Sequence, residues 1–277
     1  MNNKFKLTGI GDESADRFED QLKMHQRLGW DYIEIRNVNG ITIDTLSEEL
    51  FEKMVYLLEE KDINVSCLAS DIGKLKLGES NEPFSRDIES LHKLISYAQK
   101  LDCKYIRVMG YRQGDLSSKE WRKESIRRLK ELSGIAEKND INLGLENCVG
   151  WHADSGKRMK EVLKEVNSPN LVCLFDIGNP EPQKVWSYYQ EVKEYIQYIH
   201  VKDRKTDGNG FTYPGEGVSK VKKILEDQNE REYRGFVSIE PHMSSSAHLP
   251  ELEGNDITSW ETYKGCGKKM NEIVREL

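Results

Sequence analysis

The fold is decided by two stretches in the second half of the chain, Ile141-Asn142-Leu143-Gly144-Leu145-Glu146 and Leu171-Val172-Cys173-Leu174-Phe175-Asp176. Each is a short apolar run of strand length that closes on a carboxylate. The two carboxylates are 30 residues apart, about the length of one strand-plus-helix unit. This spacing predicts neighbouring parallel strands joined by a helix.

The same alternation extends over the whole chain. Stretches with helical periodicity, such as Leu91, Leu94, Ile95 and Ala98, separate the apolar runs. Eight units of this kind predict an α/β protein, a single (β/α)8 TIM-barrel domain over residues 1–277. A doubly wound open sheet is the alternative, but Gly9-Ile10-Gly11-Asp12-Glu13 after the first run matches no phosphate-binding loop. The predicted strands lie near residues 5–9, 31–36, 63–69, 104–109, 141–147, 171–176, 196–202 and 235–240.

Composition favours a cytoplasmic enzyme that acts on a small molecule. The chain has 277 residues, a net charge of -7 and a pI near 5.6, which argues against a nucleic-acid or membrane-surface partner. Five scattered cysteines form no CxxC pair and are expected to be reduced. Neither a signal-peptide pattern nor an apolar run long enough to span a membrane is evident.

Four potential metal ligands close four successive apolar runs: Glu146, Asp176, His200 and Glu240, at intervals of 30, 24 and 40 residues. If these runs are neighbouring strands of a barrel, the four side chains converge at its C-terminal mouth. Three carboxylates and one imidazole without a thiolate suit a divalent ion of the harder kind. We therefore expect Mn²⁺, with Mg²⁺, Co²⁺ or Zn²⁺ as alternatives, and a carboxylate basic enough to move protons.

The motifs around these residues resemble the sugar phosphate isomerase/epimerase family, the xylose-isomerase-like TIM barrels that include D-tagatose 3-epimerase, inosose dehydratase and endonuclease IV. The resemblance covers the whole chain by its count of strand–helix units, although its specific motifs are all C-terminal. It implies that the four residues above bind one catalytic divalent cation. The motifs are Leu145-Glu146-Asn147, Phe175-Asp176-Ile177-Gly178-Asn179, Ile199-His200-Val201-Lys202-Asp203, Pro214-Gly215-Glu216-Gly217 and Ser238-Ile239-Glu240-Pro241.

The resemblance also implies a reaction. In the ketose epimerases the metal binds a carbonyl and an adjacent hydroxyl, and two glutamates remove and return a proton through an ene-diolate. Glu146 and Glu240 are the matching residues, and a metal that stabilises the enolate oxygen agrees with this chemistry. We therefore expect an isomerase or epimerase acting on a keto-sugar or polyol, in a family whose members commonly form dimers or tetramers.

Two departures from the family pattern leave the reaction open. Asn179 stands where many members have histidine, and His152 stands where the ketose 3-epimerases have a second glutamate. A histidine base with a pKa near neutrality would favour elimination as readily as epimerisation, whereas a solvent-facing loop histidine would do neither. The alternatives are thus a lyase, either an inosose-type dehydratase or a 3-keto-glycoside eliminase, and a non-catalytic barrel or subunit of a hetero-complex. The small number of histidines argues against an endonuclease IV-like activity.

Other polar or aromatic side chains lie at or just beyond predicted strand ends and are candidates for substrate contact. Glu34 and Arg36 share one strand face, where a structural ion pair is the alternative. Lys202 shares the strand face of His200 and could reach a substrate oxyanion, and Trp151 could form the wall of a sugar site or simply pack. The candidates are Glu34, Arg36, Arg107, Trp151, Asn179, Lys202 and His242.

Overall fold

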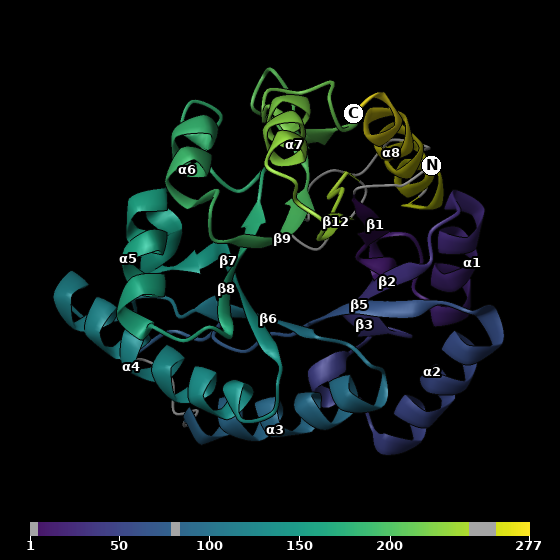
Figure 1. Ribbon diagram of the computed structural model, residues 1–277. Helices are drawn as coiled ribbons and strands as arrows, with labels where there is room; N and C mark the ends of the chain where they lie inside the picture. The colour runs from purple at the N-terminus through teal and green to yellow at the C-terminus, as the bar shows by residue number, and fades with distance from the viewer. Residues whose placement is uncertain (1–4, 79–83, 244–258) are drawn as a thin grey trace. The chain divides into compact units, whose positions relative to one another are not determined.

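The computed structural model describes residues 5–78, 84–243 and 259–277 (Figure 1). The chain forms two compact units, each built from parallel strands and helices. The middle unit comprises Val65–Ile199, and the terminal unit combines Met1–Asn64 with His200–Leu277. The expectation of one domain over the whole chain stays a prediction.

The middle unit is a parallel sheet whose strands are neighbours in chain order, as strand–helix repeats require. Its register includes Leu68 opposite Ile106, Tyr105 opposite Asn142 and Leu143 opposite Leu171. A helix follows each of the first four strands. The strands are β5 (Asn64–Ala69), β6 (Tyr105–Gly110), β7 (Asn142–Gly150), β8 (Leu171–Asp176) and the start of β9 (Ile196–Val201), and the helices are α3 (Phe84–Lys100), α4 (Ser118–Glu137), α5 (Gly156–Val166) and α6 (Val185–Val192).

The terminal unit repeats the pattern with strands from both ends of the chain. Strand β1 pairs in parallel with β12, with Lys6 opposite Phe236, and Ile10 forms a parallel bridge to Glu34 just beyond β1. The backbone of Glu240 bonds to Val201 at the end of β9, at 3.0 Å. The strands are β1 (Lys6–Gly9), β2 (Tyr32–Ile35) and β12 (Phe236–Ile239), and the helices are α1 (Phe18–Leu28), α2 (Glu48–Lys61), α7 (Val221–Glu230) and α8 (Ser259–Glu276).

Short elements complete the described parts of both units. Two-residue strands form small antiparallel pairs in the terminal unit, and single turns of 3-10 helix follow several strands. These elements are β3 (Asn37–Val38) with β4 (Ile41–Thr42), β10 (Asp203–Arg204) with β11 (Phe211–Thr212), η1 (Gly11–Glu13), η2 (Ile43–Thr45) and η3 (Trp151–Asp154).

All eight predicted strands are confirmed, and one is longer than the sequence indicated. The apolar pattern of β7 ends near Asn147, yet the strand continues to Gly150, which pairs with Gly110 after an irregularity in the register of β6. Gly150 has a φ of 126°, a conformation that side chains other than glycine rarely adopt. The extension therefore depends on glycine contacts that hydrophobic periodicity does not report.

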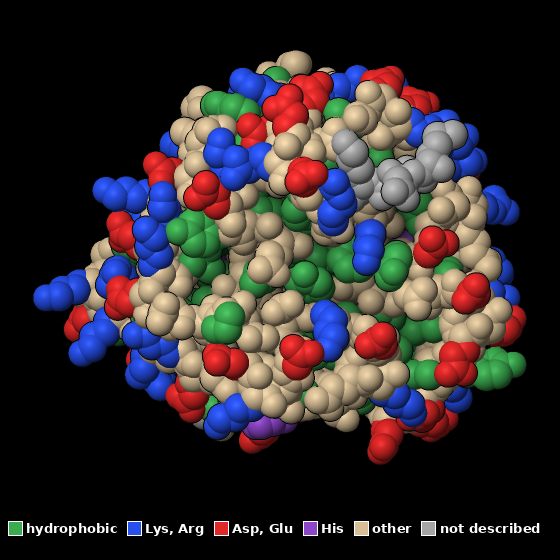
Figure 2. Space-filling model, viewed as in Figure 1, with side chains coloured by type: hydrophobic (Ala, Val, Ile, Leu, Met, Phe, Trp, Pro, Cys, Tyr) green, Lys and Arg blue, Asp and Glu red, His purple; other side chains and the backbone are tan. Residues whose placement is uncertain are grey.

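The surface and the helices bear on the predicted partners. Figure 2 shows acidic and basic side chains interspersed over the viewed face. In the ranges 5–78, 84–243 and 259–277, no helix has both the length and the apolar character needed to cross a bilayer.

Candidate functional site

Two of the predicted metal ligands lie in the middle unit, at neighbouring strands. Glu146 is on β7 and Asp176 ends β8, and these two residues are only 1% and 0% exposed. Parallel pairing of these strands brings the two carboxylates to the same edge of the sheet. Burying a carboxylate is costly unless charge or hydrogen bonds compensate it, so the neighbours of these groups matter.

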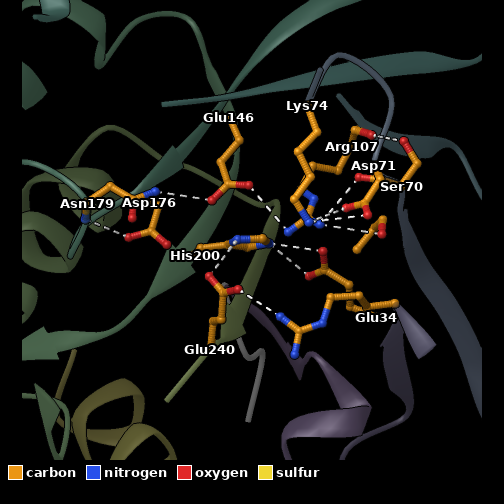
Figure 3. A network of polar contacts seen from close by, with 12 residues as sticks. Glu34, Ser70, Asp71, Lys74, Arg107, Glu146, Asp176, Asn179, His200 and Glu240 are labelled. Carbon is orange, nitrogen blue, oxygen red and sulfur yellow. Dashed lines mark hydrogen bonds and ion pairs between the residues drawn. The ribbon is translucent and has the colours of Figure 1, made fainter. Parts of the chain in front are cut away.

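Arg107 and Asn179 supply that compensation for Glu146. Arg107, predicted to contact substrate, lies with Nη1 3.3 Å from Oε2 of Glu146 and also donates to the carbonyl of Ser70 at 3.3 Å. The Asn179 amide donates to Oε1 of Glu146 at 3.2 Å (Figure 3). Arg107 and Asn179, both predicted to contact the substrate, therefore hold Glu146, a predicted metal ligand, in place.

The turn after β8 orients Asp176. The backbone N–H groups of Gly178 and Asn179 donate to its Oδ1 at 2.7 and 3.0 Å. Asn147, whose part the sequence did not reveal, accepts from the backbone N–H of Asp176 at 2.7 Å and donates to its carbonyl at 3.0 Å. Its side chain thus joins the ends of β7 and β8.

His152 is buried rather than exposed on a loop, so the solvent-facing alternative is wrong. Its Nε2 lies 2.7 Å from the backbone carbonyl oxygen of Glu146, an acceptor that requires hydrogen on Nε2. Its Nδ1 faces Gly110 closely: a Cβ at Gly110 would lie 2.2 Å from it. Burial lowers the pKa of His152 to about 4, which makes the ring neutral at pH 7.

The other two predicted ligands lie in the terminal unit. His200 is near the end of β9 and is fully buried, with Nε2 3.0 Å from both carboxylate oxygens of Glu34. Ser238 donates to Oε2 of the same glutamate at 2.6 Å. The other ring nitrogen of His200, Nδ1, lies 3.7 Å from Oε2 of Glu240 (Figure 3).

Glu240 lies among basic side chains. Lys202 Nζ is 2.9 Å from Oε2, while Arg36 Nη1 and His242 Nε2 are 3.2 and 3.0 Å from Oε1. Burial alone would raise the pKa of Glu240, but the nearby Lys202, and after it His242, outweigh burial and hold that pKa well below its ordinary value. Glu240 is therefore an anion with low basicity.

Two acidic residues that the sequence did not assign complete this cluster. Arg36 also pairs with Asp12 at 3.0 Å and Glu13 at 3.1 Å. The backbone N–H of His242 donates to Glu13 at 2.9 Å. Burial lowers the pKa of His242, but the nearby Glu240 raises it by a larger amount, so the pKa lies above its ordinary value.

The loop after β9 is organised by Asp203. Its carboxylate accepts from the backbone N–H groups of Gly215, Gly217 and Ser219 at 2.9 to 3.0 Å. A Cβ at Gly217 would lie 2.3 Å from Oδ1, so this approach requires glycine. The loop therefore has a fixed path next to Lys202.

Trp151 contacts two guanidinium groups in the middle unit. Arg122 and Arg158 lie 5.2 and 4.7 Å from its ring, and the side chain is nearly buried. These are packing contacts, and a role beside a sugar ring stays a prediction. A cavity of about 350 Å³ lies nearby, and its wall includes Ser155, Lys157, Asn179, Glu181, Lys184 and Tyr188.

Comparison with known proteins decides the family. A protein-family model described as a xylose isomerase-like TIM barrel matches residues 22–261. The chain belongs to this family. The predicted (β/α)8 TIM barrel is thus confirmed, and the doubly wound alternative is wrong.

This xylose isomerase-like barrel has relatives that are sugar isomerases and epimerases. It is 29% identical to a fructoselysine 3-epimerase of Escherichia coli O157:H7 over 119 residues, 40% of this chain and 42% of the relative. An inosose isomerase of Bacillus velezensis is 23% identical over 92% of this chain and 91% of that protein. The chain thus spans only about two fifths of the length of the first curated relatives that it matches.

Solved structures agree with the fold of this xylose isomerase-like barrel. The IOLI protein with a bound zinc atom superposes with a TM-score of 0.75, at 19% identity, over 98% of this chain and 99% of that one. At that identity the likeness establishes the fold alone.

Proposed function

We propose that this protein is a divalent-metal-dependent isomerase or epimerase acting on a keto-sugar or polyol, and that Glu146, Asp176, His200 and Glu240 bind one ion. The observation that carries the proposal is the burial of all four potential ligands at or near the strand ends: Glu146 within β7, Asp176 as the last residue of β8, His200 one residue before the end of β9, and Glu240 directly after β12. In TIM barrels, residues at these strand ends are the catalytic ones. Membership of the family and the names of its relatives support the same reaction class.

Each unit contributes donor groups of the kind that bind a divalent cation. The middle unit offers two buried carboxylates, and the terminal unit offers a carboxylate and an imidazole nitrogen turned toward it. Oxygen-rich sets of this kind suit Mn²⁺, our first choice, and also Mg²⁺, Co²⁺ or Zn²⁺. A bound dication would supply the positive charge that stabilises the oxyanion formed when a carbon next to a carbonyl loses its proton.

The two glutamates are the proposed proton carriers, and their surroundings differ. Glu240 contacts Lys202, Arg36 and His242, and its pKa lies well below the ordinary value, so it is anionic and weakly basic. Glu146 contacts one guanidinium and one neutral amide. We therefore assign the first proton abstraction to Glu146 and the return of the proton to Glu240. Lys202 has an ammonium group suited to an oxyanion, as the sequence suggested.

Elimination is the second outcome of the same proton abstraction, and His152 was the reason to consider it. The contact of His152 with the backbone of Glu146 supplies no support for a role as a second base. Epimerisation without loss of a leaving group therefore remains the first expectation. A substrate appendage beyond the reacting carbons could enter the cavity beside Asn179.

Metal titration of the metal-free protein tests the shared site. Calorimetry with Mn²⁺ should give one ion per chain. Loss of a residue that only supports a ligand is expected to weaken binding by roughly 10- to 100-fold. A larger loss is expected for each of the four ligand substitutions: Glu146→Gln, Asp176→Asn, His200→Asn and Glu240→Gln. Glu226→Gln, an exposed carboxylate on α7, is the control. If only the substitutions within one unit weaken binding, the four residues do not share an ion.

Solvent exchange then tests the reaction. We expect the Mn²⁺-loaded protein, incubated with ketoses, inososes and 3-keto-glycosides in deuterated water, to place deuterium on the carbon next to a carbonyl. Glu146→Gln should abolish that exchange, and retained exchange would refute its role as base. Metal binding without exchange on any substrate would favour a non-catalytic barrel, whereas an unsaturated product would identify a lyase.

A further inference from the structure

We propose that Glu34 is a positioning residue that keeps hydrogen on Nε2 of His200, so that Nδ1 is the nitrogen that meets the metal. The proposal rests on the proposed function, since it concerns how one of its four ligands is prepared. It assigns Glu34 a task different from the substrate contact that the sequence suggested.

The first step is the contact between Glu34 and His200. Both carboxylate oxygens lie 3.0 Å from Nε2, and a carboxylate can only accept hydrogen bonds. A bare Nε2 would place a lone pair against this anion. Hydrogen on Nε2 is therefore the favoured state, and the lone pair of the neutral ring is then on Nδ1.

The second step is the direction of Nδ1. It lies 3.7 Å from Oε2 of Glu240, the other proposed ligand of the terminal unit. The ring thus presents Nε2 to Glu34 and its other nitrogen, Nδ1, to Glu240. This is the arrangement by which a second carboxylate fixes ring orientation and raises the basicity of a metal-binding histidine.

The third step is the anchoring of Glu34 itself. Its side chain is fully buried on β2, and Ser238 donates to Oε2 at 2.6 Å. Ser238 is two residues before Glu240, on the same face of β12. A buried anion costs more than an apolar side chain of similar size would, so this position is better explained by selection of the histidine tautomer than by stability.

Nitrogen NMR of the imidazole rings measures the tautomer directly. We expect His200, assigned by comparison with His200→Asn, to show a protonated Nε2 in the metal-free protein and in the Zn²⁺-loaded protein, and a proton-free Nδ1 when Zn²⁺ is bound. The metal-free spectrum keeps this test independent of catalysis. A bare Nε2 with a protonated Nδ1 in wild-type protein would overturn the proposal.

Two substitutions test the consequence for the metal. In Glu34→Gln an amide can donate as well as accept, so we expect a mixture of tautomers and a Zn²⁺ affinity lower by roughly 10- to 100-fold. Ser238→Ala should change the tautomer population and the Zn²⁺ affinity in the same direction as Glu34→Gln, but by a smaller amount. Asp87→Asn, at a buried carboxylate that accepts from Tyr111, is the matched control. Unchanged tautomer and affinity in Glu34→Gln would refute the positioning role, whether or not the protein proves to be an epimerase.

Discussion

His152 donates to the main chain of Glu146, and this contact gives the histidine a supporting role that can be separated from acid–base chemistry. We predict that His152→Ala lowers metal affinity by roughly 10-fold, since the backbone of β7 at Glu146 loses its hydrogen-bond partner. His152→Gln should restore part of the loss because its amide can also donate. The measurement is Mn²⁺ calorimetry on both variants.

Deuterium exchange distinguishes this role from the alternative. A general base would leave metal affinity unchanged on removal but abolish exchange at saturating Mn²⁺. A supporting residue should show exchange once the ion is saturating. Abolished exchange with normal affinity would therefore return His152 to the catalytic role that the sequence suggested.

The sequence predicts the positions of the four proposed ligands better than it predicts the residues that contact them. Glu146 and Asp176 end apolar runs that form buried strands, so their position follows from local pattern alone. Asp12 and Glu13 follow a strand and contact Arg36 from another part of the chain, which local pattern does not specify. Ser238 did carry a signal, because a polar residue two positions before Glu240 in an apolar strand shares its face.

At the scale of elements, the close approach of Gly110 on β6 to His152 and Gly150 controls the end of β7. A Cβ on Gly110 would lie 2.2 Å from Nδ1 of His152. Gly110→Ala must therefore displace the ring from Glu146. We predict a loss of stability of about 1–3 kcal/mol, as for overpacking in a core, together with weaker Mn²⁺ binding, measured by urea unfolding and calorimetry.

Helix α4 offers a matched control for that change. Ser117 and Glu120 form a capping box at its exposed start. Ser117→Ala should cost about 1 kcal/mol of stability and leave metal affinity unaltered. Equal effects of both substitutions on affinity would mean that metal binding follows global stability and not the position of His152.

Elements differ in how far the sequence specifies them. Strands of four to nine residues with flanking helices were predictable because their apolar runs are long enough to define a period. The two-residue strands β3, β4, β10 and β11 have no period and depend on loop contacts. In the loop after β9, Asp203 provides those contacts through three backbone N–H groups.

For the whole molecule, acid stability is expected to depend on histidines buried in the neutral form. His25 on α1 is fully buried, with Nδ1 2.7 Å from the carbonyl of Tyr32 and Nε2 2.9 Å from the hydroxyl of Tyr263. Burial lowers its pKa from 6.5 to about 4.

The sign of the pH effect follows from this shift. Between pH 6.5 and pH 4 the unfolded chain binds a proton at His25 that the folded protein does not, so stability rises with pH over this window. The contribution of neutral His25 to the free energy of unfolding is complete above pH 6.5. At pH 5 about 2 kcal/mol of this free energy should be lost. Urea unfolding at pH 8 and pH 5 measures the change.

His25→Gln should be less stable at pH 8 but should lose about 2 kcal/mol less than wild type on acidification, because the carboxylates titrate equally in both proteins. If the two proteins lose the same stability, His25 is not the buried neutral group that its contacts indicate.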